Sequence, residues 1–166
     1  MLAEPDVVPM MADHIDGFHR ALDVVARERR YLTLLEAPPP ERTRDFVLEG
    51  LRKGDPRFVA VAASEVVGWC DIGRHPFAAH AHRGSLGMGL VPEFRGRGLG
   101  FRLITAALHE AWASHFTRVE LSVHADNARA LALYAKVEFA REGIVRDSAC
   151  IDGQYRDAIT MAIVQR

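Results

Sequence analysis

The sequence predicts an α/β fold, in which a central mixed β-sheet carries helices on both of its faces. Helical patterns come first along the chain, and strand-like and helix-like segments then alternate up to a last strand. Such an order is typical of a mixed sheet that is covered on both sides. The chain has 166 residues, and domains usually contain ~100–200 residues, so we expect one domain over 1–166.

Two helices are expected before the first strand. Apolar residues recur at spacings of three and four over 13–30, which predicts an amphipathic helix with Asp13 as its N-cap. The prolines 38–40 separate this pattern from a second, short helix over 41–53, and Gly54 stands where that helix should end.

Strands and helices alternate in the rest of the chain. The expected elements are strands over 57–63, 66–72, 84–91, 118–124 and 155–164, and helices over 98–115 and 127–137. The first two strands flank Ser64-Glu65 and are expected to form a β-hairpin. Three glycines interrupt the strand at 84–91, and glycine inside a strand often marks a bulge or a ligand close to the backbone.

Composition and charge exclude several classes of protein. Apolar residues make up 49% of the chain and charged residues 26%, which excludes a disordered or fibrous protein. The formal net charge of −1 argues against a general nucleic-acid binder. No apolar run reaches the ~18–20 residues that span a bilayer and no signal peptide is recognisable, so we expect a cytoplasmic protein with no membrane partner. Two cysteines are too few for a disulfide framework or a four-ligand zinc site, and we expect no metal.

The strongest chemical signal is the turn Val91-Pro92-Glu93-Phe94-Arg95-Gly96-Arg97-Gly98-Leu99-Gly100, which leads from a strand into a helix. Glycines let the backbone turn tightly and point several N–H groups at one place, and the positive end of the following helix adds to the same field. This pattern predicts an anion cradle suited to a pyrophosphate, with the side chains of Arg95 and Arg97 as additional charges. The spacing fits neither a Walker A loop nor the G-x-G-x-x-G dinucleotide fingerprint, and the alternative is a turn that binds nothing.

A second candidate group lies at the next strand-to-helix junction. Asn127 stands at this junction, where its side chain could cap the helix or bind a ligand. Tyr134 follows seven residues later and therefore shares a helix face with Asn127. A tyrosine at this position could fill the core, but its phenol could also protonate a departing thiolate.

These two groups of residues resemble the motifs of the GNAT superfamily of N-acetyltransferases. Arg95, Gly98 and Gly100 match its R/Q-x-x-G-x-G/A signature, and the segment from Asn127 to Tyr134 matches its downstream N-x-x-A-x-x-L-Y pattern. The resemblance extends over nearly the whole chain. It implies the superfamily's fold, a mixed sheet in which two parallel strands splay apart.

The resemblance also implies acetyl-CoA as the acetyl donor, with its pyrophosphate on the backbone amides of the turn and its pantetheine along the preceding strand. The implied donor-site residues are Leu90, Val91, Arg95, Gly96, Arg97, Gly98, Leu99, Gly100, Asn127 and Tyr134. An acceptor amine would attack the thioester directly. Tyr134 would then protonate the coenzyme A thiolate, and the strand amide near Leu90–Val91 would hold the oxyanion.

The sequence lacks a group that many relatives carry, a glutamate on the fourth or fifth strand that acts as general base. Ser85 and Ser122 stand at these two positions, and neither serine is a strong base. The catalytic candidates are therefore Ser122, His82 and His124, together with Tyr134. The histidines near His82 lie on a loop and have no spacing specific to a metal site.

Glu138 is a further departure from the family pattern, because relatives commonly have glycine at this position. It follows a predicted helix, where a left-handed backbone conformation costs a non-glycine residue about 1 kcal/mol. We expect this departure to affect local geometry and not the chemistry.

The acceptor is expected to be an amine of a small molecule or a peptide. The N-terminal helix pair and the hairpin would form the walls of its cleft. Candidate contacts, each of which could instead be a surface charge or part of the core, are Glu28, Tyr31, Glu36, Trp69 and Asp71. The alternative function is a non-catalytic acyl-CoA-binding sensor or interaction module on the same fold. Dimers are common in the superfamily, so a homodimer is one of the states that the resemblance allows.

Overall fold

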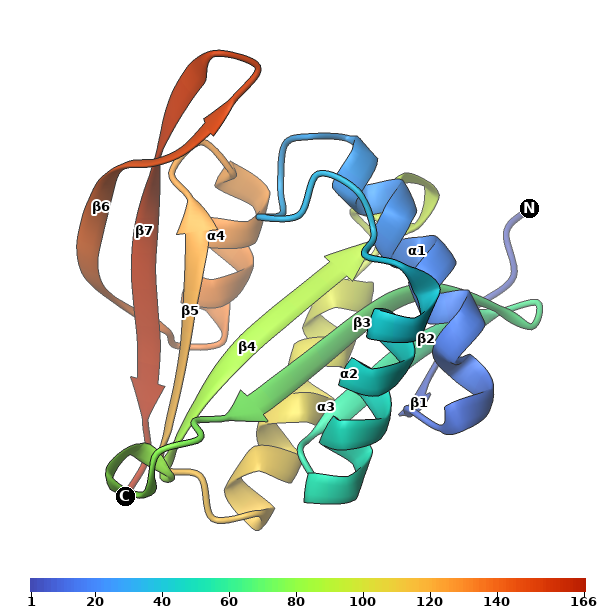
Figure 1. The fold of residues 1–166 in the computed structure, drawn as a ribbon, viewed down its shortest axis with the longest axis horizontal. Coiled ribbons are helices and arrows are strands. Elements are labelled where there is room, and N and C mark those ends of the chain that lie inside the picture. Colours follow the sequence, from blue (N-terminus) through green and yellow to red (C-terminus); the bar gives the residue numbers. More distant parts are fainter.

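A computed structural model describes residues 1–166 and contains one seven-stranded sheet in the order β1-β2-β3-β4-β5-β7-β6 (Figure 1). The strands are β1 (Asp6–Pro9), β2 (Arg57–Ala62), β3 (Glu65–Arg74), β4 (Arg83–Leu90), β5 (Arg118–His124), β6 (Ala140–Ile151) and β7 (Gln154–Val164). The helices are α1 (Ile15–Arg27), α2 (Pro40–Lys53), α3 (Leu99–Ala113) and α4 (Ala128–Lys136), with short 3-10 turns at Ala12–His14, Ala78–His80 and Pro92–Phe94. The predicted mixed α/β architecture is therefore confirmed.

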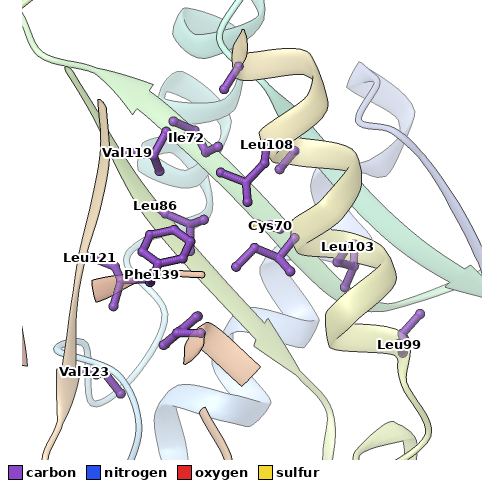
Figure 2. Packing of buried hydrophobic residues seen from close by; sticks show 14 of the residues in the cluster. Cys70, Ile72, Leu86, Leu99, Leu103, Leu108, Val119, Leu121, Val123 and Phe139 are labelled. Carbon is purple, nitrogen blue, oxygen red and sulfur yellow. The ribbon is translucent and has the colours of Figure 1, made fainter. Parts of the chain in front are cut away.

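Helices cover both faces of the sheet. On one face α1 and α2 pack against the sheet in a cluster that contains Phe18, Val47, Val59 and Trp69. On the other face α3 and α4 form the larger cluster, in which Leu103 is fully buried. Figure 2 shows the leucines of α3 lying over the buried side chains of β3, β4 and β5. No helix of the structure is both long and apolar enough to cross a membrane.

The sheet has one parallel pair, β4 with β5, and this pair is short. Only three residue pairs join the two strands, namely Arg83 with Arg118, Gly84 with Val119 and Ser85 with Glu120. Glu120 accepts charge-assisted hydrogen bonds of 2.6 Å from both Arg83 and Arg118, which ties the strands together at this end. Beyond Ser85 the strands run apart, as Figure 1 shows, and a gap opens toward the end of β4.

The neighbours of β4 explain why this strand contains glycines. A Cβ atom at Gly84 would lie 2.7 Å from the Phe116 ring, and one at Gly89 would lie 2.4 Å from the Trp69 ring. These two glycines make room for neighbouring side chains and not for a bulge. A Cβ at Gly87 would meet only the Asp71 carboxylate, at 3.8 and 3.9 Å.

Some predicted boundaries and elements were wrong. Helix α1 begins at Ile15, and Asp13 does not cap it, because residues 12–14 form a 3-10 turn in which the Met11 amide donates to His14 Nδ1. The hairpin turn lies one residue earlier than expected, at Ala63 and Ser64, which both have positive φ as in a type I′ turn. Strands β1 and β6 were not predicted. Strand β1 has only four residues, and β6 is an exposed edge strand with two register shifts, so it shows no alternating pattern.

Candidate active site

A pocket with a volume of about 670 Å³ passes through the gap between β4 and β5. On the α1 side it is lined by Val25 and by the loop that follows α1, and on the other side by Gly100 of α3 and Tyr134 of α4. Because residues from both faces of the sheet line it, the pocket connects the two faces. A donor and an acceptor could therefore meet in the gap from opposite sides.

The glycine-rich turn forms one end of this pocket. Gly96 and Gly98 adopt left-handed conformations with φ of +75° and +79°, which only glycine adopts without strain. Helix α3 starts directly after Gly98 with no side-chain cap and no acidic residue in its first turn. The first N–H groups of a helix have no partner within the helix, so the turn keeps the backbone donors that the predicted anion site requires.

Gly100 serves a packing role in the same turn. A Cβ at this position would lie 3.1 Å from Leu133 Cδ2 on α4. The missing side chain therefore lets α3 and α4 approach each other beside the pocket.

The Arg95 side chain lies differently from the prediction. Its Nε donates to the Leu90 carbonyl at 3.0 Å, and its two terminal nitrogens pair with the Glu28 carboxylate at 2.9 and 2.5 Å. The guanidinium also stacks over the Tyr31 ring, 4.8 Å from its centroid. Glu28 thus compensates the charge of Arg95, and Arg97 is the side-chain cation of the turn that has no ion-pair partner.

The end of β4 presents backbone groups to the gap. The Val91 amide donates to the Val67 carbonyl at 3.0 Å, so this amide faces β3 and is not available to a ligand. In an antiparallel pair the hydrogen-bonding groups alternate in direction, so the N–H groups of Leu90 and Met88 face the gap. Leu90, and not Val91, therefore offers an amide to the pocket.

Tyr134 lies at the centre of the pocket wall formed by α4. It is 8% exposed, and its ring packs against Phe139 with a centroid distance of 5.8 Å. Burial raises the pKa of the Tyr134 phenol, so the hydroxyl keeps its proton throughout the physiological pH range. Asn127 caps α4, because its Oδ1 accepts from the Ala130 amide at 3.2 Å, while the residue also lines the pocket.

The predicted catalytic candidates separate into two groups. Ser122 lines the pocket from β5, and His124 is buried nearby, where its Nδ1 donates to the Arg30 carbonyl at 2.9 Å. His82 is exposed and precedes β4, so it lies at the opposite end of that strand from the open gap. Eight strand residues span ~26 Å at the usual rise. His82 is therefore not part of this site.

A second, smaller pocket of about 160 Å³ adjoins the first on the α1 side. Tyr31, Leu32, Thr33 and Ser122 line both pockets, so the two are continuous. Residues 148–151 of β6 form its far wall. The ionisable side chains in its lining are those of Tyr31, His124 and Cys150. This wall could not be predicted, because the exposed strand β6 has no regular hydrophobic pattern.

Several of the predicted donor-site residues line the main pocket, and others lie beside it. Those that line it are Leu90, Arg95, Gly100, Asn127 and Tyr134, whereas Val91, Gly96, Arg97, Gly98 and Leu99 belong to the adjoining turn.

Of the residues expected to contact the acceptor, some line the pockets and others lie in the core or on the surface. Tyr31 lines both pockets. Trp69 is 4% exposed and packs edge-on against Phe18, so it belongs to the core. Glu36 is an exposed partner of Arg27.

The splayed parallel strands, the glycine turn that opens α3 and the buried tyrosine of α4 are the features of an acyl-CoA N-acyltransferase fold. Residues 21–139 match the family described as "Acetyltransferase (GNAT) family". This match covers more than half of the chain, and the chain belongs to the GNAT family.

Individual relatives give the same classification. The chain is similar to the [Ribosomal protein uS5]-alanine N-acetyltransferase of Escherichia coli (strain K12), at 32% identity over 83 residues, which are 49% of this chain and 43% of that protein. The chain thus spans less than half the length of that curated relative. It is also similar to the L-amino acid N-acetyltransferase AaaT of the same strain, at 29% identity over 148 residues, which are 84% of this chain and 87% of that protein.

A solved structure shows the likeness of the fold. The phosphinothricin acetyltransferase of Sinorhizobium meliloti, in complex with acetyl-CoA, superposes with a TM-score of 0.91 at 16% identity, over 97% of this chain and 88% of that one.

Proposed function

We propose that residues 1–166 form one N-acetyltransferase domain, which transfers the acetyl group of acetyl-CoA to a primary amine of a small molecule or peptide. The observation that carries this proposal is the pocket through the gap between β4 and β5, which joins the anion-binding turn to the opposite face of the sheet. The buried Tyr134 phenol lines the same pocket. A cytoplasmic location stays a prediction of the sequence.

The residues present fit acetyl-CoA. The uncapped start of α3 and the unpaired Arg97 suit a pyrophosphate. Arg129 lines the pocket and also has no ion-pair partner, so it is available to a further phosphate. The free N–H groups of Met88 and Leu90 can pair with the amides of pantetheine, which would take the place that β5 leaves open.

Each residue has a separate task in the reaction. The Leu90 N–H points at the gap, where it can stabilise negative charge on the thioester oxygen during the attack of the amine. Tyr134 donates its phenolic proton to the departing sulfur. The two cysteines are not needed for direct attack, and burial raises the pKa of the Cys70 thiol, which disfavours the reactive thiolate.

The first experiment is an acetyl-CoA turnover screen that detects free thiol, run with amino acids, short peptides, polyamines and aminoglycosides. Tyr134→Phe is run beside the wild type, because it removes the proton and keeps the ring. We expect kcat to fall ~10²-fold or more, while the Kd of acetyl-CoA measured by calorimetry stays unchanged.

Two outcomes would contradict the proposal. Equal turnover by Tyr134→Phe would remove this residue from the mechanism. Tight binding of acetyl-CoA without turnover on any acceptor would support the non-catalytic sensor instead.

A further inference from the structure

Asp71 places an unpaired carboxylate beside the pocket. On β3 it stands directly opposite Gly87 of β4 and Arg57 of β2. A Cβ added to Gly87 would lie 3.8 and 3.9 Å from the two carboxylate oxygens of Asp71. Both oxygens therefore lean over the backbone of β4 at a residue that lines the pocket and has no side chain of its own.

The nearest cation does not neutralise this carboxylate. Arg57 is 6% exposed, its guanidinium lies over the Phe46 ring at 4.2 Å, and two of its nitrogens have no hydrogen-bond partner. A Cβ at Gly50 would lie 1.9 Å from Arg57 Nε, so the guanidinium is held under α2. Arg57 and Asp71 make no ion pair, although their residues are paired across the two strands.

Few other charged groups face Asp71. Asp55 lies in the turn before β2 and, with Arg57, acts on the carboxylate electrostatically. The buried faces of α1 and α2 carry no charged residue. On this side of the sheet β4 presents Arg83, Ser85, Gly87 and Gly89, and Arg83 is paired with Glu120 of β5. Burial raises the pKa of the Asp71 carboxyl to about 6. The charge of Arg57 lowers this pKa, and the charge of Asp55 raises it by a smaller amount.

The gap opens next to this carboxylate. Pairing between β4 and β5 ends at Ser85, two residues before Gly87. Ser122 of β5 lines the same pocket from across the gap. Asp71 itself does not line the pocket, but its carboxylate lies over Gly87, which does. Neighbouring strands lie ~4.8 Å apart, so one water can bridge the carboxylate to the gap.

We propose that Asp71 is the general base of the proposed acetyltransferase and accepts a proton from the acceptor's ammonium, directly or through one water. This inference rests on the proposed function and adds the group that is missing from the fourth and fifth strands, where Ser85 and Ser122 stand. Asp71 would supply this base from the third strand, over Gly87 of the fourth.

The protons balance in the following way. Asp71 takes one proton from the ammonium and releases it to water, which leaves a neutral amine. The nitrogen lone pair forms the new C–N bond as the C–S bond breaks, and Tyr134 gives its proton to the sulfur. The nitrogen then loses its surplus proton, which returns through solvent to the Tyr134 oxygen.

The test compares the pH profiles of kcat/KM for wild type and Asp71→Asn, with Asp55→Asn as the matched control. Asp55 is the other carboxylate near Arg57, and it lies before β2 and not on β3 opposite Gly87. At pH 7.5 Asp71→Asn should lose ~10²-fold or more in kcat/KM. Its activity should rise with pH as the acceptor amine loses its own proton, and the acid limb near pH 6 should disappear. Asp55→Asn should keep the acid limb, moved to a lower pH because the charge of Asp55 no longer raises the pKa of Asp71.

A glycine variant tests the same geometry without removing the carboxylate. Gly87→Val places a branched side chain between Asp71 and the gap, and Gly73→Val is its control, because a Cβ at Gly73 meets nothing within 4 Å. We expect activity to fall for Gly87→Val and to persist for Gly73→Val, with melting temperature and acetyl-CoA binding recorded for both.

The outcomes separate the two proposals. If the wild type acetylates an acceptor and Asp71→Asn retains its rate and its acid limb, Asp71 is not the base and the proposed function stands. A loss that is equal at every pH would also overturn the role of base. If the wild type binds acetyl-CoA and acetylates nothing, the proposed function fails, and this inference fails with it.

Discussion

Glu138 holds a backbone conformation that favours glycine. Its φ is +74°, and it follows α4. The next amide, that of Phe139, donates a hydrogen bond of 2.9 Å to the Tyr134 carbonyl. This left-handed conformation was expected from the position of Glu138 after the helix. The strain lies within a few residues of Tyr134 but involves no group of the pocket.

Glu138→Gly should therefore stabilise the protein without changing its chemistry. We expect the free energy of unfolding to rise by about 1 kcal/mol, which corresponds to ~2–4 °C in Tm for a chain of this size. Urea unfolding measures the change. Glu138→Ala keeps the strained φ and is the control, and an equal gain in both variants would contradict the explanation by strain.

Asp71 gives a second prediction at the scale of a residue, now for stability. Its raised pKa means that the folded chain binds more protons than the unfolded chain between pH ~4 and ~6, so its contribution to stability falls as pH rises through this window. At pH 7.5 the ionised carboxylate therefore opposes folding. Asp71→Asn should have a free energy of unfolding at least equal to that of wild type, measured in urea at pH 7.5. A clear loss of stability would indicate a structural role.

Some of the site's residues could be predicted from sequence and others could not. Asn127 and Tyr134 line the same pocket, as expected from a spacing of seven, which brings two residues to one helix face. The partner of Arg95 could not be predicted, because Glu28 reaches it only when the end of α1 folds against the turn. His82 stands before β4, at the other end of that strand from the gap, and does not line the pocket.

At the scale of elements, one ion pair joins the two walls of the smaller pocket. Arg29 follows α1 and Asp152 lies in the turn between β6 and β7, and their side chains form two hydrogen bonds of 3.0 and 2.7 Å. Both residues have positive φ. Their side chains are 42% and 65% exposed, and such exposed pairs contribute only ~0–1 kcal/mol to stability. The pair therefore matters for the position of the walls more than for the fold.

Asp152→Asn should change acceptor binding and leave the fold intact. Asparagine tolerates the left-handed conformation but loses the charge that holds Arg29. We expect a higher KM for the acceptor with an unchanged Kd for acetyl-CoA and an unchanged Tm. Glu65→Gln is the matched control, because it breaks an exposed ion pair between Glu65 of the β2–β3 hairpin and Arg20 of α1. Neither of these residues lines a pocket. A KM that rises equally in both variants would contradict a role for the Arg29–Asp152 pair.

Most elements could be predicted because hydrophobic periodicity and glycine positions mark them clearly. Strand β5 has the predicted bounds, and α2 ends at Gly54 with φ of +72°. Strand β6 could not be recognised, since it is exposed along nearly its whole length and pairs only with β7. One wall of the smaller pocket belongs to this strand, so that wall was also missed.

At the scale of the whole molecule, the sheet consists of two halves that meet at one short junction. Strands β1 to β4 form one half, and β5, β7 and β6 form the other. Strand β5 pairs with β7 over its full length, whereas only three residue pairs connect β4 to β5. The open edges of β4 and β5 are the places where bound acetyl-CoA would supply the missing hydrogen bonds.

Hydrogen exchange can test this arrangement. We expect acetyl-CoA to slow exchange of the Met88 and Leu90 amides, which face the gap, and to leave the amides shared by β5 and β7 unchanged. Mass spectrometry of peptides from β4 and β7 measures both. Equal protection of the two peptides, or none in β4, would contradict binding along the edge of β4.

The short junction between β4 and β5 would make the stability of the folded chain depend on the proposed donor, acetyl-CoA. A ligand that binds only the folded state stabilises it by about 2.7 kcal/mol when its concentration is 100 times its Kd. Acetyl-CoA that bridges both halves of the sheet would act in this way, so starvation for acetyl-CoA should expose more of the chain to proteases. The abundance of the protein would then follow the supply of its own donor substrate.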